Sequence, residues 1–182
     1  FELLKAKLAA EGLFAPERKR LLPAMPKKIA VISSVQSAGY ADFVKILGER
    51  WGAIDVDVAT VQVQGEVAPD QMIRALNYFN EQEALAEVIV LIRGGGSADD
   101  LSAFNDELLV RAVASSRIPV ITGIGHETDE SLCDLAADVA AATPSNAAQL
   151  LVPDKADIAH RVRQSLRQIV HKTEGKVTTH QA

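Results

Sequence analysis

The stretch EVIVLIRGGGSADD, residues 87–100, decides the fold. Its first part is a short, uninterrupted apolar run rich in β-branched residues, which is typical of a strand buried on both faces. Three consecutive glycines follow, and Ser97 with Asp100 resembles the capping box that opens a helix. A buried strand, a glycine turn and a helix form the repeating unit of a parallel α/β sheet.

The same unit recurs along the chain. Further apolar runs occupy residues 28–34, 54–64 and 118–124. Helical spacing of apolar residues follows the four runs, at residues 42–51, 69–79, 99–115 and 127–142. We therefore predict a doubly wound α/β domain with a mostly parallel four-stranded sheet in the order 2-1-3-4 and flanking helices. The second run begins with strict alternation, which indicates an edge strand with one wet face.

The two ends of the chain differ from this central part. Residues 1–28 form a basic N-terminal helix and entry segment, residues 29–153 the α/β domain, and residues 154–182 the start of a long projecting helix or coiled coil. The chain opens at Phe1 without an initiator methionine, so we expect it to be part of a longer protein. It has no apolar run long enough to span a membrane. A single cysteine, Cys133, favours a cytoplasmic location.

The charge is unevenly distributed, although the net charge is only −5. Residues 1–28 hold seven Lys or Arg against three acids, and residues 155–182 hold six against two. The middle keeps six basic and nineteen acidic residues. This pattern fits a polyanion held by the ends and processed at an acidic centre, or alternatively two solvated helix faces.

The loop after the third strand has the composition of a phosphate site. Gly94, Gly95 and Gly96 leave backbone amides unobstructed, and the helix that opens at Ser97 adds unpaired N–H groups. Arg93 supplies a permanently charged, forked donor. A tight, closely packed turn is the simpler interpretation of the glycines.

The loop after the fourth strand carries His126, with Glu127 and Asp129 close behind it. Histidine titrates near neutral pH and can transfer protons to water or to a leaving oxygen. Either carboxylate could orient the ring. The alternative role for His126 is a packed or capping ring at a helix start.

The loop after the first strand holds Ser33 and Ser34 and leads to Asp42, about one helical turn in. Asp42 could position water or pair with Arg93, or it could simply suit the dipole of a helix N-terminus. Asn105 could reach the glycine loop from the following helix. Since there is no pair of cysteines and no His-x-x-x-His, the chain predicts no dedicated metal centre, and its acids suggest at most a hard divalent cation.

At these loops the chain resembles the large subunits of exodeoxyribonuclease VII. The matching segments are RGGGS at 93–97 with DL at 100–101 and FNDE at 104–107, GHETD at 125–129, Asp134, AD at 137–138, TPS at 143–145, VQG at 63–65 and PERK at 16–19. They occur in the right order across about residues 1–155.

The resemblance implies a hydrolase that cuts single-stranded DNA into short oligonucleotides, with no strict need for a divalent metal. It places the catalytic set on Asp42, Arg93, His126 and Asp129. It also implies an OB-fold domain before this part, a long helical arm after it, and several copies of a small helical subunit that bind the arm. Self-association through the terminal helix is a further expectation.

The chain departs from the family pattern at three positions. Ser102 stands where an aromatic residue is usual, Ala140 where an arginine is expected, and Val35 where a proline is common. The alanine puts one phosphate contact or ion pair in doubt, whereas the four catalytic positions are intact.

Two other functions fit the residues less well. A nucleotide-binding, kinase-like α/β enzyme would also use a strand, a glycine loop and a helix, but the chain lacks a P-loop lysine and the Gly-x-Gly-x-x-Gly fingerprint. A non-catalytic DNA-binding scaffold is the third possibility. Only 4% of the residues are aromatic, so stacking platforms for bases are scarce in this part of the chain.

Overall fold

The computed structural model describes residues 1–82, 86–94, 98–125 and 130–179, with the backbone alone at 98–100 and 171–179. In chain order the elements are α1 (Glu2–Ala10), η1 (Pro16–Arg18), β1 (Lys28–Ser33), α2 (Ala38–Arg50), β2 (Asp55–Thr60), α3 (Ala68–Glu81), β3 (Val88–Ile92), η2 (Ala98–Asn105), α4 (Glu107–Ser115), β4 (Val120–Gly123), α5 (Leu132–Ala136), β5 (Val139–Ala140), α6 (Pro144–Leu151) and α7 (Lys155–Thr179).

The strands form one parallel sheet in the order β2-β1-β3-β4-β5. The predicted order of the first four strands is confirmed, and a short fifth strand extends the sheet beyond β4. The chain reverses its direction of winding between β1 and β3, because β2 lies on one side of β1 and β3 on the other. This is the switch point at which open parallel sheets bind ligands.

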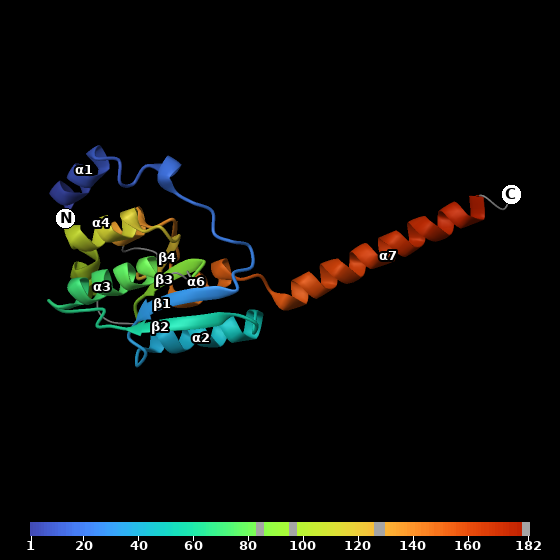
Figure 1. Cartoon of the computed structure of the whole chain (residues 1–182), viewed down its shortest axis with the longest axis horizontal. Coiled ribbons are helices and arrows are strands. Elements are labelled where there is room, and N and C mark those ends of the chain that lie inside the picture. The colour runs from blue at the N-terminus through green and yellow to red at the C-terminus, as the bar shows by residue number, and fades with distance from the viewer. Residues whose placement is uncertain (83–85, 95–97, 126–129, 180–182) are drawn as a thin grey trace.

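Each face of the sheet carries its own core, as expected of a doubly wound domain. Alternation along β1 sends Ile29 and Val31 to the face covered by α2 and α6, and Ala30 and Ile32 to the face covered by α3 and α4. Figure 1 shows α2 on one side of the strands and α3 with α4 on the other.

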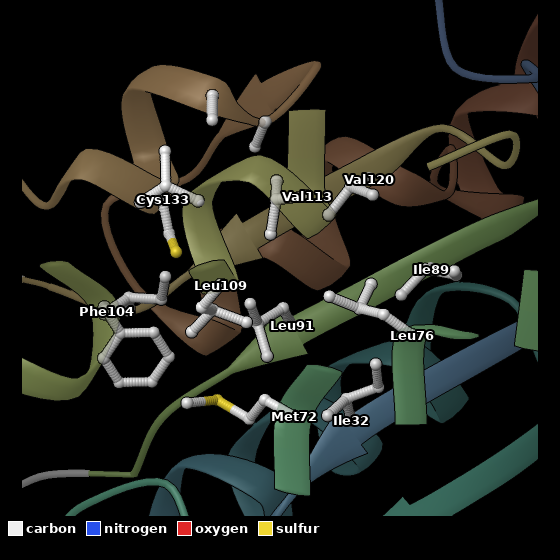
Figure 2. Packing of buried hydrophobic residues seen from close by; sticks show 14 of the residues in the cluster. Ile32, Met72, Leu76, Ile89, Leu91, Phe104, Leu109, Val113, Val120 and Cys133 are labelled. Carbon is white, nitrogen blue, oxygen red and sulfur yellow. The ribbon is translucent and has the colours of Figure 1, made fainter. Parts of the chain in front are cut away.

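The larger core lies under α3, α4 and α5. Figure 2 shows Met72 and Leu76 of α3 and Leu109 and Val113 of α4 packed around Leu91 of β3. These residues are between 0% and 1% exposed. The strands whose ends carry the loops are therefore closely packed against the helices.

The predicted helix over 99–115 is two elements. A 3-10 helix, η2, ends at Asn105, and α4 starts only at Glu107. Asp106 separates them because its carboxylate accepts a hydrogen bond from the Leu109 N–H and caps α4. The capping box expected at Ser97 and Asp100 lies outside the described side chains.

The predicted helix over 127–142 is wrong. Its described part holds the five-residue helix α5, which begins at a capping box between Ser131 and Asp134, and then the strand β5. The chain leaves helical geometry at Ala137, and the Ala141 N–H then bonds to the Thr122 carbonyl of β4. Pairing with β4 therefore overrides the helical spacing of the leucines.

The terminal helix is confirmed, and β2 is an edge strand as predicted. The single wet face predicted for β2 is wrong, because both of its faces are exposed or half-buried. Helix α7 projects away from the α/β domain (Figure 1). Among the described helices, none has both the length and the apolar composition needed to cross a membrane.

Candidate active site

The loops with the unusual residues all leave the same edge of the sheet. Strands β1, β3 and β4 are neighbours and run parallel, so their carboxyl ends at Ser33, Ile92 and Gly123 lie side by side. The sequence therefore concentrates its glycines and candidate catalytic groups along one edge.

A pocket of about 300 Å³ opens at this edge. We call it the Arg93 pocket. Its described lining comes from the start of α2, the end of β3, the end of β4 and the start of α6, namely Ala38, Gly39, Asp42, Arg93, Gly94, Ile124, Gly125, Thr143, Pro144 and Ser145. Two of the four predicted catalytic residues, Asp42 and Arg93, thus share one pocket although 51 positions separate them in sequence.

Arg93 is held firmly in the pocket wall. The residue is only 4% exposed, and its backbone N–H donates to the Gly123 carbonyl at 3.2 Å. A guanidinium is permanently charged, and its planar fork of donors matches phosphate oxygens. Asp42 is exposed on α2 and lines the same pocket.

Gly94, just after β3, packs directly against Ser37 at the start of α2. A β-carbon added at Gly94 would lie 2.3 Å from the Ser37 β-carbon, and no side chain fits there. Gly94 therefore has the packing role that the sequence left open, and it also lines the pocket. Gly95, Gly96 and Ser97, the other predicted phosphate-binding residues, lie outside the described residues.

Two helix N-termini border the Arg93 pocket. The Ser37 hydroxyl caps α2 by accepting from the Tyr40 N–H at 3.1 Å, and the Thr143 hydroxyl caps α6 by accepting from the Asn146 N–H at 3.1 Å. Helix N-termini carry partial positive charge and attract anions. Together with Arg93 they place positive charge around the pocket.

The start of α6 was missed from the sequence, because residues up to 142 were assigned to one helix. Thr143 followed by Pro144 was the available signal, since an N-cap threonine with proline at the first helical position marks a helix start.

His126, Glu127 and Asp129 lie outside the described residues, but both flanks of their loop are placed. Gly125 lines the Arg93 pocket, and Ser131 opens α5. The proposed roles of His126 and Asp129 stay predictions.

A buried hydrogen-bond network holds the far flank of this loop. The Asp134 carboxylate accepts from the Thr122 hydroxyl at 2.6 Å and from the Ser131 N–H and hydroxyl at 3.0 and 2.7 Å. The Asn105 amide oxygen accepts from the Leu132 N–H at 2.9 Å. Asn105 therefore ties α5 to η2, which is a supporting contact different from the reach toward the glycine loop that the sequence suggested.

The two serines after β1 are placed differently. Ser33 is fully buried and does not belong to the described lining of the Arg93 pocket. Ser34 is half-buried and lines a neighbouring pocket on the same edge. A supporting role for either residue stays a prediction.

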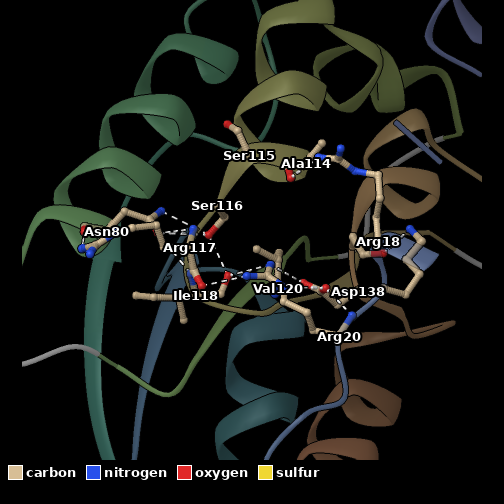
Figure 3. A network of polar contacts seen from close by, with 12 residues as sticks. Arg18, Arg20, Asn80, Ala114, Ser115, Ser116, Arg117, Ile118, Val120 and Asp138 are labelled. Carbon is tan, nitrogen blue, oxygen red and sulfur yellow. Dashed lines mark hydrogen bonds and ion pairs between the residues drawn. The ribbon is translucent and has the colours of Figure 1, made fainter. Parts of the chain in front are cut away.

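The basic N-terminal segment contacts the opposite end of the strands, where β4 begins. Arg18 donates to the Ala114 carbonyl, Lys19 to the Leu135 and Ala137 carbonyls, and Arg20 to Asp138. We call residues 18–20 the basic strap, and Figure 3 shows Arg18 and Arg20 reaching toward the ends of α4 and β4. These cations bind protein carbonyls and a carboxylate, so they are not a free surface for a polyanion.

Asp138 is the centre of that contact. Its carboxylate accepts from the Arg20 guanidinium at 2.9 and 2.8 Å and from the Val120 N–H at 2.7 Å. Burial by itself would raise the pKa of Asp138, but the hydrogen bonds from Arg20 and from the Val120 N–H outweigh it and hold the pKa below its ordinary value.

Within the described part of the chain, no three His, Cys, Asp or Glu residues lie close enough to hold a metal ion together. His126, Glu127 and Asp129 fall outside that search.

Comparison with known proteins identifies the family. The family model for the exonuclease VII large subunit matches residues 13–182. The chain belongs to the exonuclease VII large-subunit family. Its relatives include proteins named exodeoxyribonuclease 7 large subunit from Koribacter versatilis, 49% identical over 89% of this chain, and from Stenotrophomonas maltophilia, 49% identical over 93%. The relative from Nostoc is 45% identical over 96% of this chain.

The chain spans only part of these large subunits, covering 35%, 38% and 43% of the three relatives. Within this part, Ala140 replaces the arginine expected from the family pattern. It lies exposed on the edge strand β5, where its backbone is paired with Thr122.

Proposed function

We propose that this chain is the catalytic core of an exodeoxyribonuclease VII large subunit, which hydrolyses phosphodiester bonds of single-stranded DNA to short oligonucleotides. The observation that carries the proposal is the Arg93 pocket, which is lined by a buried arginine, two helix N-termini and an exposed carboxylate. The positive charge of the pocket binds a phosphate, and the carboxylate of Asp42 positions water or a proton donor.

In the proposed mechanism the scissile phosphate binds against Arg93 and the amides of residues 94–96. Arg93 neutralises the negative charge that develops on the phosphate in the transition state. His126 transfers a proton, either from the attacking water or to the leaving oxygen, and Asp129 orients its ring. Ser97 and Glu127 support the same loops. No divalent cation is strictly required for these steps, so cleavage is expected to continue in chelator.

The proposed partners are single-stranded DNA and the small helical subunit. Helix α7 supports the second, because its apolar side chains form one exposed stripe. The described stripe consists of Val162, Leu166, Ile169 and Val170, which are 52–61% exposed. Spacing of four, three and one residues places them on one face of the helix, as in helices that bind in a partner's groove. The same stripe could pair with a second copy of the chain.

A cytoplasmic location belongs to the same proposal. Cys133, the single cysteine, is a buried free thiol of α5 and takes part in no disulfide. Cytoplasmic proteins typically keep their thiols reduced.

Membership of the large-subunit family favours this function over a nucleotide-binding kinase. The test uses the full-length large subunit assembled with its small subunit and a fluorescent single-stranded oligonucleotide, in the presence of chelator. We expect Arg93→Lys, Asp42→Asn and His126→Ala each to lower kcat by about 10²–10³-fold, the usual effect of removing one transition-state contact.

Matched controls come from α3, where Arg74 and Asp70 form an exposed ion pair. Arg74→Lys and Asp70→Asn should cleave at the rate of the unmodified protein. Equal rates for His126→Ala and the unmodified assembly would refute the catalytic role of that residue, and a folded assembly that never cleaves DNA would favour the scaffold.

A further inference from the structure

A second pocket, of about 570 Å³, lies beside the Arg93 pocket on the carboxyl edge of the sheet. It opens between the loops that follow β1 and β2. Its described lining consists of Ser34, Gln36, Ser37, Gln62, Val63, Gln64, Gly65 and Gly94. We call it the glutamine pocket. Gly94 lines both pockets, so the two are adjacent.

The chemistry of the glutamine pocket differs from that of its neighbour. Its described lining offers three primary amides and two hydroxyls, and it includes no charged side chain. A primary amide donates two hydrogen bonds and accepts two, and a hydroxyl does both as well. Such a pocket suits a neutral ligand that has both donors and acceptors. It offers no charged side chain in its described lining that could pair with a phosphate.

The loop that presents the glutamines is fixed to the domain. Val63 is buried, whereas Gln62 and Gln64 on either side are exposed. The Gln62 N–H donates to the Gln71 side chain of α3 at 2.8 Å, so the backbone of this loop is tied to a helix.

The loop ends in a defined turn. Gly65 adopts a φ of +87°, which an L side chain rarely adopts, and its carbonyl accepts from the Ala68 N–H at 3.2 Å. On the other side of the pocket, Ser37 accepts from the Tyr40 N–H and can still donate its own proton. The polar groups of the pocket therefore lie on two segments, the loop after β2 and the start of α2, that are both held by hydrogen bonds.

We infer that the glutamine pocket binds the base of the nucleotide next to the scissile phosphate in single-stranded DNA. This inference rests on the proposed function, because it takes the phosphate to occupy the Arg93 pocket. A nucleotide carries its neutral base directly beside its charged phosphate, as the neutral pocket lies directly beside the positive one.

Hydrogen bonding is the mode of recognition that the lining favours. In a single strand the Watson–Crick edges of the bases are open to donors and acceptors of the protein. Glutamine amides match these edges, whereas the described lining contains no aromatic side chain on which a base could stack. The pocket is therefore expected to read the edge of the base and to contribute to substrate binding more than to the chemical step.

The test uses the assembled enzyme with full-length subunits. The substrates are two single-stranded oligonucleotides of the same sequence, one intact and one with a single abasic residue at a defined position. For the unmodified enzyme, we expect cleavage at a bond flanking the abasic residue to be slower by about 3–10-fold, the worth of roughly one hydrogen bond.

Gln62→Ala and Gln64→Ala are the test variants, since both side chains are exposed and the backbone contact of residue 62 is kept. Each should raise KM for the intact strand by about 3–10-fold with little change in kcat, and each should cleave the two strands at more nearly equal rates. Gln82→Ala is the matched control, because this exposed glutamine lies at the other end of α3. It should behave like the unmodified enzyme.

The outcomes separate the inference from the proposed function. If the unmodified assembly cleaves DNA but both glutamine variants still discriminate against the abasic strand as it does, the base-binding pocket is refuted while the nuclease stands. The same holds if the unmodified assembly does not discriminate at all. If the unmodified assembly cleaves neither strand, the proposed function itself fails.

Discussion

Gly39 and Gly94 are in backbone contact across the candidate active site. A β-carbon added at Gly39 would lie 2.7 Å from the Gly94 α-carbon and 2.7 Å from the Arg93 carbonyl oxygen. The start of α2, which carries Asp42, therefore packs directly on the chain that carries Arg93. The spacing between the start of α2 and the end of β3, which line the Arg93 pocket, depends on this contact.

Gly39→Ala should destabilise the protein although alanine favours helices. The added methyl group meets two backbone atoms that cannot turn away, and such overpacking typically costs about 1–3 kcal/mol. Cleavage should fall as well, because Asp42 and Arg93 move apart. Urea unfolding gives the change in stability, and the oligonucleotide assay gives the change in rate.

The control for this variant lies in the same helix. A β-carbon at Gly48 would meet nothing within 4 Å, so Gly48→Ala should stabilise the protein by about 0.5–1 kcal/mol through helix propensity alone. If the two alanine variants were equally stable, the close contact at Gly39 would not exist in solution.

Thr122→Val should weaken the support of the loop that carries His126. The substitution preserves shape but removes the hydroxyl that donates to the buried Asp134 carboxylate. We expect a loss of about 1.5–3 kcal/mol in the free energy of unfolding, the range for hydrogen bonds to charged groups. Thr60→Val, at an exposed position of β2, should change stability by less than about 0.5 kcal/mol. Equal effects at both sites would contradict the role of this network.

The Arg20–Asp138 contact should make stability depend on acid. Since the pKa of Asp138 in the folded chain lies below its ordinary value of 3.8, the ionised carboxylate stabilises the fold at pH above 3.8. This contribution is lost as the pH falls below 3.8 and through the lowered pKa. Asp138→Asn should therefore lower stability by about 1.5–3 kcal/mol at neutral pH, and the difference from the unmodified protein should shrink in acid.

Urea unfolding at a series of pH values from neutral to acidic measures this dependence. Asp55→Asn, at the exposed start of β2, is the control and should leave the pH profile unchanged. A constant difference between Asp138→Asn and the unmodified protein at all pH values would argue against the ion pair.

Leu166→Asp should weaken binding of the small helical subunit without unfolding the α/β domain. The side chain is 56% exposed on the apolar stripe of α7, so a carboxylate there costs the free chain little but must be desolvated in a complex. We expect at least about a tenfold loss of affinity in a pull-down titration with purified small subunit. Gln164→Asp adds the same charge on the other face of α7, and a comparable loss there would refute the proposed interface.

The sequence predicted the sheet well because its strands are buried on both faces. Runs such as residues 88–92 contain only apolar residues. A strand with this composition buries its side chains in the cores on both faces of the sheet. Prediction was poorest at 99–115 and 127–142, where apolar spacing suggested continuous helices. There the hydrogen bonds to the carboxylates of Asp134 and Asp106 determine where α5 and α4 begin. The hydrogen bond from the Ala141 N–H to the Thr122 carbonyl of β4 pairs the following segment with the sheet as β5.

The sequence by itself determined the fold class, the order of the first four strands and the edge at which the unusual loops gather. These follow from local periodicity and from the rule that parallel strands end at one edge. Only the tertiary structure decided that Asp42 and Arg93 line one pocket, that α6 adds a second helix N-terminus, and that the basic strap binds protein groups at the opposite end of the strands. Such contacts join residues far apart in sequence, and their geometry depends on how helices pack on the two faces of the sheet, which no local pattern encodes.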